Sequence, residues 1–179
     1  MKTVQPIRDK QLIESMKIQL ADCKRNVFLF TLGINTGLRI SDLLRLKVNE
    51  VRNVTHIIII EQKTKKLKRF KINETLKLAI NDYTHSMPDD VYLFKSLRGT
   101  KPIKRVQAWK ILNQAAKQVG LSEIGTHTLR KTFGYHFYQK YKDVAVLQQI
   151  FNHSSPAVTM RYIGINQDIM DEKIDGFSL

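Results

Sequence analysis

The 179-residue sequence predicts an α+β fold that is mostly α-helical and has one small antiparallel β-sheet. Residues 56–61, HIIIIE, form a β-branched run of strand length, and residues 67–73, LKRFKIN, alternate imperfectly as its partner. The charged QKTKK between these two runs favours a hairpin turn. On both sides of this pair the apolar residues recur at helical spacing.

The N-terminal third is expected to be helical. DKQLIESMKIQLAD carries its apolar residues on one face of a 3.6-residue repeat. VFLFTLGINTG is almost wholly apolar and ends at Gly37, which favours a buried central helix capped by that glycine. ISDLLRLKV predicts a short helix directly after it.

After the hairpin the chain is expected to return to helices. Their predicted ranges are 74–86, 104–119, 127–140, 143–151, 156–163 and about 167–174. Thr126 is the expected N-cap of the helix that contains HTLRKTF, and Ser155 with Pro156 suits another helix start. Trp109 is expected in the core.

The composition favours a nucleic-acid partner. Thirty Lys and Arg residues against sixteen Asp and Glu give a formal charge of +14. A basic surface that only maintains solubility is the alternative. A membrane surface is a weaker one, because no stretch approaches the ~20 apolar residues of a spanning helix. MKTVQPIRDK lacks a signal-peptide core, and Cys23 is the only cysteine, so we expect a reduced cytoplasmic setting without disulfides.

The charge is unevenly distributed. Residues 62–77 contain seven Lys and Arg residues and one acid, Glu74, whereas residues 166–179 contain four acids and one lysine. This asymmetry predicts a basic working surface and a tail with a different role.

The side chains suited to chemistry are cations and a phenol. They are Arg39, a lysine of QKTKK, His127, Arg130, His153 and Tyr162. The sequence has no Asp/Glu/His cluster at metal-binding spacing, no phosphate-binding glycine loop and no GxSxG motif. His127 and Arg130 are three positions apart near a predicted helix N-terminus, where anions are favoured.

Such a set suits attack on a DNA phosphodiester. Arginines and a histidine can stabilise the negative charge that builds on the non-bridging oxygens. A tyrosine phenol, with a pKa of about 10, is a nucleophile that can also leave again. A lysine can protonate the departing 5′-oxygen as a general acid.

Four segments, TGLRISDLLRL, QKTKK, HTLRKTF and HSSPAVTMRY, occur in this order. Together they resemble the catalytic domain of the tyrosine recombinases, also called phage integrases, over nearly the whole chain. The resemblance implies the DNA breaking-rejoining enzyme fold. It also implies site-specific recombination through a 3′-phosphotyrosyl intermediate, without a metal or nucleotide cofactor.

The resemblance implies roles for residues that bind the phosphate. Arg39 and Arg130 correspond to the arginine pair that holds the scissile phosphate, and His153 corresponds to a histidine that hydrogen-bonds it. Asp42 corresponds to a supporting residue near Arg39 rather than to a catalyst.

It also implies roles in bond making and proton transfer. Tyr162 corresponds to the nucleophile, and His127 to a histidine that assists acid–base chemistry around it. Lys63 corresponds to the hairpin lysine that protonates the leaving oxygen. Lys65 and Lys66 also fit the turn, but contact with the DNA backbone or solvation is the better interpretation for both.

The sequence departs from the family pattern in three ways. Phe151 and Asn152 precede the second histidine where many members have Leu-Gly, although asparagine also tolerates left-handed backbone angles. Ile163 follows Tyr162 where a small or polar residue is common. Family members also usually carry an N-terminal helical domain that grips the other side of the DNA.

The expected organisation is a catalytic domain over residues 1–165 and a C-terminal tail helix within 166–179, with no N-terminal core-binding domain in this chain. The tail carries a rough apolar stripe formed by Ile169, Met170, Ile174 and Phe177. This stripe packs either on its own domain or on a neighbouring protomer in a DNA-bound tetramer.

Double-stranded DNA is the expected partner, and accessory proteins stay open as further partners. Backbone contacts are expected from Lys65, Lys66, Lys131 and Arg161, with plain solvation as the alternative. Two rival functions share the fold: a DNA-binding regulator that no longer cleaves, and a type IB topoisomerase-like enzyme. Strand exchange by a recombinase would pass through a Holliday junction.

Overall fold

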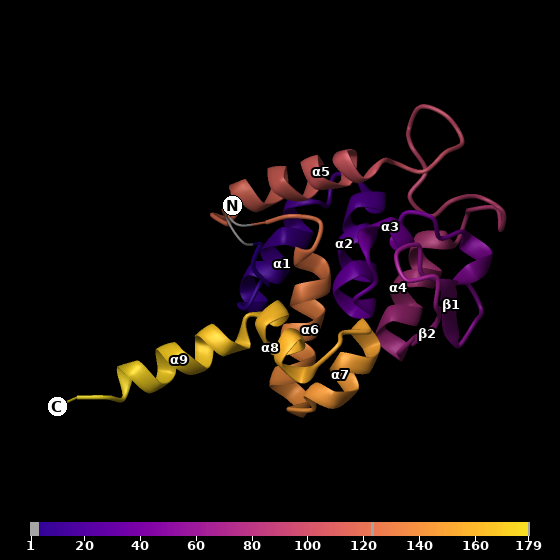
Figure 1. Ribbon diagram of the computed structural model, residues 1–179. Coiled ribbons are helices and arrows are strands. Elements are labelled where there is room, and N and C mark those ends of the chain that lie inside the picture. The colour runs from indigo at the N-terminus through magenta and orange to yellow at the C-terminus, as the bar shows by residue number, and fades with distance from the viewer. Residues whose placement is uncertain (1–3, 123, 179) are drawn as a thin grey trace.

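The computed structural model describes residues 4–122 and 124–178, and it confirms the predicted mostly helical fold with a small sheet (Figure 1). In chain order the described elements are α1 (Lys10–Gln19), α2 (Lys24–Thr36), α3 (Ile40–Leu43), the 3₁₀ turn η1 (Val48–Glu50), β1 (His56–Ile60), β2 (Leu67–Lys71), α4 (Glu74–Thr84), α5 (Arg105–Gln118), α6 (Thr128–Tyr141), α7 (Val144–Phe151), α8 (Pro156–Ile163) and α9 (Ile165–Asp175).

The sheet is the predicted antiparallel hairpin. β1 and β2 pair so that Ile57 faces Phe70, and both of these side chains are buried in the core. The second strand ends at Lys71, earlier than expected, because Asn73 instead caps α4 by accepting a hydrogen bond from the Leu76 backbone amide. The turn between the strands carries the QKTKK segment.

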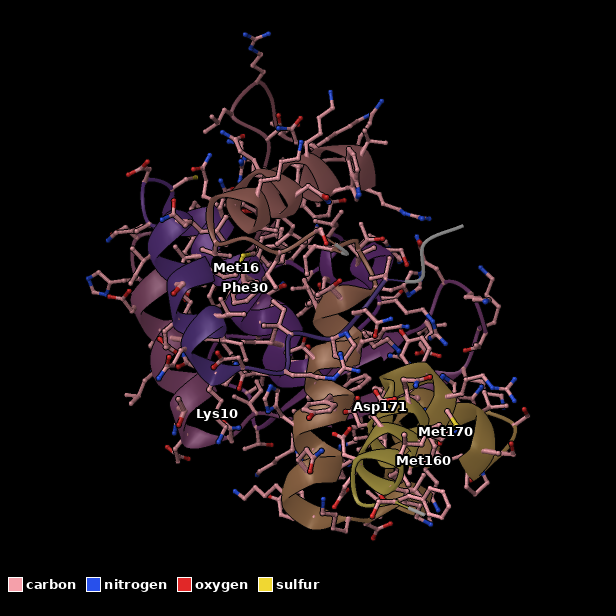
Figure 2. The ribbon with its side chains drawn as sticks, turned by 90° about the vertical axis from the view of Figure 1, so that its left-hand side faces the viewer. Lys10, Met16, Phe30, Met160, Met170 and Asp171 are labelled. Atoms are coloured by element: carbon pink, nitrogen blue, oxygen red, sulfur yellow. The ribbon has the colours of Figure 1, made fainter. Side chains whose placement is uncertain are left out.

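Helix α2 is the centre of the larger core. Its Phe28, Leu29, Phe30 and Leu32 are buried, and α4 and α6 pack against it. Figure 2 shows Met16 of α1 and Phe30 of α2 inside this group of helices. Close contact with α6 depends on Gly33, since a Cβ there would lie 2.5 Å from Leu129 Cδ1.

A second, smaller core holds the C-terminal elements together. Leu147, Phe151, Ile163 and Ile165 are buried where α7 and α8 pack beside α6. Gly134 of α6 lets Phe151 and Ile163 approach, because a Cβ there would lie 2.7 Å from both side chains. This core fixes the position of the two helices that frame HSSPAVTMRY.

Helix α9 extends away from the rest of the molecule (Figure 1). Residues 169–178 are all exposed, including the four residues of the apolar stripe. Figure 2 shows Met170 and Asp171 on this helix. Its base is tied to the body, because Arg8 Nη2 donates to Asp168 Oδ1 at 2.9 Å.

Two local predictions were wrong. Thr126 does not cap α6, because a turn over residues 125–128 precedes the helix and makes His127 the N-cap residue. Trp109 is 45% exposed and not in the core, because α5 contacts the body through a stripe that includes Ala108 and Leu112. None of the helices in the described part of the chain is long and apolar enough to cross a membrane.

Candidate active site

Arg39 lies at the junction between α2 and α3. Gly37 ends α2 with a left-handed φ of 63°, as the sequence predicts, and Arg39 is the residue just before α3. Its Nη1 donates to the Glu61 carboxylate, which is fully buried at the end of β1. The guanidinium is thereby oriented without any ligand.

Arg130 is placed by α6 and is only 3% exposed. Its Nη1 donates to the Gly37 carbonyl at 2.6 Å, and its Nη2 donates to the Phe151 carbonyl at 2.9 Å. Burial, assisted by the nearby Arg39, lowers the pKa of Arg130 to about 10, so the side chain stays charged at neutral pH. Two backbone carbonyls from separate elements therefore fix one cation beside Arg39.

His153 follows a left-handed turn at the end of α7. Asn152 caps that helix with φ 53°, so the turn survives the departure from Leu-Gly as predicted. His153 Nδ1 lies 3.1 Å from the Thr159 hydroxyl, which leaves Nε2 for another partner. Burial, with Arg130 and Arg39 nearby, lowers its pKa to about 4, so His153 is neutral at pH 7.

Tyr162 lies on α8, which begins at the predicted Ser155 cap and Pro156. Its hydroxyl is 3.3 Å from His127 Nδ1, and its ring lies edge-on to the His153 ring at 5.0 Å between centroids. Burial raises the pKa of the Tyr162 phenol, while the positive charges of Arg130 and Arg39 act in the opposite direction. The phenol is therefore protonated before substrate arrives.

His127 lies next to the Tyr162 hydroxyl and close to several cations. Its pKa is lowered by burial first and then by neighbouring cations, among them Arg105, Arg130 and Lys63. A neutral imidazole at this distance from a phenol can accept its proton.

The hairpin loop brings Lys63 to the same side of the molecule as His127. Lys63 is exposed, and its charge is one of those that act on His127. Lys66 instead donates to Asn152 Oδ1 at 3.1 Å, and Lys65 is exposed with a left-handed φ of 58°. The structure thus brings together Arg39, His127, Arg130, His153 and Tyr162, while Lys63 lies on the exposed loop, where its charge acts on His127.

Lys131 differs from the expected surface position. It is only 8% exposed, and its Nζ lies 5.1 Å from the centre of the Tyr162 ring. Burial lowers the pKa of its ammonium, and Arg8 adds to the effect. Arg161, by contrast, is exposed as expected.

The sequence analysis missed two residues of the site. Glu61 accepts hydrogen bonds from Arg39 and from the Thr64 hydroxyl. Lys68 donates to the Gln149 carbonyl at 2.6 Å, and burial lowers its pKa. Glu61 could have been noticed as a single acid directly before a run of cations. Nothing in the sequence distinguishes Lys68 from the other lysines of that run.

The site can bind an anion among Arg39, Arg130 and His153 and present a tyrosine hydroxyl to it. Within residues 4–122 and 124–178, no group of three His, Cys, Asp or Glu side chains is arranged to hold a metal ion. This arrangement is the one expected of an enzyme in which a tyrosine attacks a phosphodiester.

Comparisons with known proteins identify that class. Residues 5–168 match the phage integrase family. The probable integrase/recombinase YoeC of Bacillus subtilis is 56% identical over 94% of this chain and 93% of its own length. The tyrosine recombinase XerD of Corynebacterium glutamicum is 30% identical over 83% of this chain, which spans only 51% of that relative.

Solved structures agree on the fold. The crystal structure of XerA recombinase has a TM-score of 0.77 at 22% identity, covering 97% of this chain and 64% of that one. XerH site-specific recombinase in a post-cleavage complex with its difH substrate has a TM-score of 0.69 at 20% identity, covering 96% and 53%. The match of residues 5–168 and the similarity to YoeC show that the chain belongs to the phage integrase family, the site-specific recombinases that cleave and rejoin DNA through a tyrosine. The predicted family, fold and enzyme class are confirmed.

Proposed function

We propose that Tyr162 is the nucleophile that cleaves one DNA strand at a time and forms a 3′-phosphotyrosyl bond. The observation that carries this proposal is the position of its hydroxyl, 3.3 Å from His127 and within the field of Arg130 and Arg39. A nucleophile next to a neutral base and to fixed cations is the arrangement that phosphoryl transfer requires.

The scissile phosphate would be held by Arg39, Arg130 and His153. Both guanidiniums are already oriented by protein acceptors, and His153 keeps Nε2 free of Thr159. Charge-assisted hydrogen bonds from these groups would stabilise the negative charge of the transition state. Asp42 would support this arrangement from behind.

The proton balance is complete within the site. As the Tyr162 oxygen bonds to phosphorus, the bond to the 5′-oxygen breaks and Lys63 donates its proton to that oxygen. The phenol proton passes to His127. The phosphotyrosyl bond conserves the energy of the phosphodiester, so rejoining needs no nucleotide or metal cofactor.

Double-stranded DNA is the proposed substrate. The +14 charge and the exposed Lys65 and Arg161, together with Lys66, support contacts to the phosphate backbone. A cytoplasmic location follows from this substrate and from the free thiol of Cys23.

The assembly is proposed to be a tetramer on two DNA sites, with strand exchange through a Holliday junction. Residues 1–165 would form the catalytic domain, and residues 166–179 would dock on a neighbouring protomer. The exposed stripe of α9 supports this, because apolar side chains on an acidic projecting helix suit a basic partner surface. Accessory proteins would then be optional.

Covalent trapping tests the proposal. Wild type and Tyr162→Phe are incubated with nicked duplexes made from the DNA that flanks the gene and then run on denaturing gels. We expect a protein–DNA adduct in wild type only. Adducts in both proteins would mean that another residue is the nucleophile.

The same assay separates the rival functions. Tight binding without an adduct, also on a pre-formed junction at higher protein concentration, would favour a DNA-binding regulator. Relaxation of supercoiled DNA without exchange between two sites would favour a topoisomerase-like enzyme.

A further inference from the structure

Two buried carboxylates hold the loop that carries Lys63, and one of them also bonds Arg39. Glu61 and Asp42 are 0% and 3% exposed, the lowest values for any acids in the described chain. Glu61 directly follows β1, and Asp42 lies on α3, three residues after Arg39. Each carboxylate reaches the loop on a different side of Lys63.

On the N-terminal side, Asp42 Oδ1 accepts a hydrogen bond from the Gln62 backbone amide at 3.0 Å. On the C-terminal side, Glu61 Oε2 accepts a hydrogen bond from the Thr64 hydroxyl at 2.6 Å. Both neighbours of Lys63 in the sequence are therefore held, while the lysine side chain itself stays exposed.

The other oxygen of Glu61 points to the phosphate-binding side. Glu61 Oε1 accepts from Arg39 Nη1, so one carboxylate joins the guanidinium of Arg39 to the hydroxyl of Thr64. Backbone hydrogen bonds close the loop at the same residue, from Lys65 N to Glu61 O at 2.9 Å and from Glu61 N to Lys66 O at 3.0 Å. The loop cannot shift without disturbing Arg39.

A buried carboxylate with both oxygens engaged is costly to maintain unless its partners are fixed. Its cost here is offset by charge-assisted bonding to Arg39, and its negative charge also opposes the repulsion between Arg39 and Arg130. Glu61 is therefore suited to hold two functional groups at a set separation.

We propose that Glu61 and Thr64 are positioning residues that fix Lys63 relative to Arg39. Glu61 orients the guanidinium that binds the phosphate, and Thr64 transmits that position to the lysine that protonates the leaving oxygen. This inference rests on the proposed function and adds to it two residues that touch neither phosphate nor leaving group.

The test replaces the leaving atom. Sulfur in place of the bridging 5′-oxygen leaves as a thiolate, because a thiol pKa near 8.5 makes protonation unnecessary. A defect in proton donation is therefore rescued by sulfur, whereas a defect in phosphate binding is not. The duplex is the nicked one that gives the wild-type adduct, and single-turnover cleavage rates are compared on the oxygen and sulfur forms.

The variants separate the two links. Lys63→Ala should cleave the oxygen form about 10²–10⁴-fold more slowly than wild type, the usual contribution of a general acid. Its cleavage rate should recover on the sulfur form. Thr64→Val should lose about tenfold or more on oxygen and also recover, because only the lysine position is disturbed. Glu61→Gln should cleave both forms more slowly than wild type, because Arg39 loses its partner as well. Its cleavage rate should recover only partly on the sulfur form.

Thr55→Val is the control, since Thr55 is exposed before β1 and far along the strand from the loop. It should match wild type on both substrates. The inference would be overturned if Thr64→Val cleaved the oxygen form at the wild-type rate. It would also be overturned if this variant lost cleavage rate equally on the oxygen and sulfur forms. A wild-type protein that cleaves neither duplex would overturn the proposed function itself.

Discussion

At the level of single residues, the two arginines of the site are held by protein acceptors before any DNA arrives. Arg130 is fixed by two backbone carbonyls and Arg39 by Glu61. Cations that need no reorganisation when charge develops are more effective than mobile ones. Burial also keeps His153 neutral, so protonating this side chain destabilises the folded state.

That last point predicts a pH dependence of stability. The pKa of His153 is about 4 in the folded protein against a usual 6.5, so the unfolded chain binds more protons between these values. The stability that the neutral His153 contributes is complete above about pH 6.5 and is lost as the pH falls toward 4. His153→Asn should therefore lose less stability than wild type between pH 7 and 5, measured by urea unfolding midpoints.

The comparison has an internal reference at pH 8, where His153 is neutral in both states. Any difference there reports the lost packing against Phe151 and Tyr162 and the lost contact with the Thr159 hydroxyl. Parallel pH curves for the two proteins would contradict the prediction.

Lys131 gives a second prediction at this scale. Its ammonium is buried beside the Tyr162 ring, whereas Lys65 is exposed on the hairpin loop. Each phosphate contact contributes about 0.9 to the slope of log affinity against log salt. Lys65→Met should reduce that slope by about this amount, and Lys131→Met should leave it unchanged, in filter-binding titrations over a salt series. A reduced slope for Lys131→Met would make it a phosphate contact after all.

The site residues could be predicted to the extent that local sequence fixes them. Arg39 after a glycine cap, and His127 and Arg130 at a helix start, lie in short segments through which the chain resembles the tyrosine recombinases. Glu61 could not be found in this way, because its role depends on burial between a strand end and a distant helix. The burial of Lys131 could not be predicted for the same reason, since the contacts of α8 decide which face of α6 is covered.

At the scale of elements, the end of α2 is the junction on which the arginine pair depends. Gly37 has a left-handed φ of 63°, its carbonyl accepts from Arg130, and a Cβ there would lie 2.5 Å from Phe133 Cδ1. The glycine thus serves the helix cap, the packing of α6 and the position of the site together.

We therefore expect Gly37→Ala to be costly. The left-handed angle alone costs about 1–2 kcal/mol for a residue with a Cβ, and the clash with Phe133 adds about 1–3 kcal/mol. Gly120→Ala is the matched control: it also has a positive φ, 76°, near a helix end, but no atom lies within 4 Å of its Cβ position. Urea unfolding should show a clearly larger loss for Gly37→Ala, and equal losses would refute the packing argument.

The elements themselves were largely predictable. The hairpin follows from β-branched runs around a charged turn, and α2 from an apolar run that ends at a glycine. Errors occurred where tertiary context decides, as at Asn73, which caps α4 instead of extending β2. Trp109 was misplaced because α5 buries its small residues and leaves the large one outside.

At the scale of the whole molecule, a basic body and an acidic projecting helix stand in contrast. Residues 169–178 are all exposed, with Ile169, Met170 and Ile174 of the apolar stripe on α9 and Phe177 just beyond the end of the helix. An exposed apolar stripe of this kind is suited to the association with a neighbouring protomer that we propose.

Removing residues 166–179 should therefore separate folding from assembly. The deletion leaves Ile165 in the core and removes one ion pair, Arg8–Asp168, whose side chains are 35% and 30% exposed, so stability should fall by no more than about 1 kcal/mol. Adduct formation by single protomers on nicked duplexes should persist, while complexes larger than one protomer per site should be lost in native gels on DNA with two sites. Asp168→Asn keeps the stripe and should still assemble, whereas Ile174→Glu keeps the ion pair and should not. The deletion removes the whole stripe. If the shortened protein assembled as well as wild type, the stripe would therefore not be what joins the protomers.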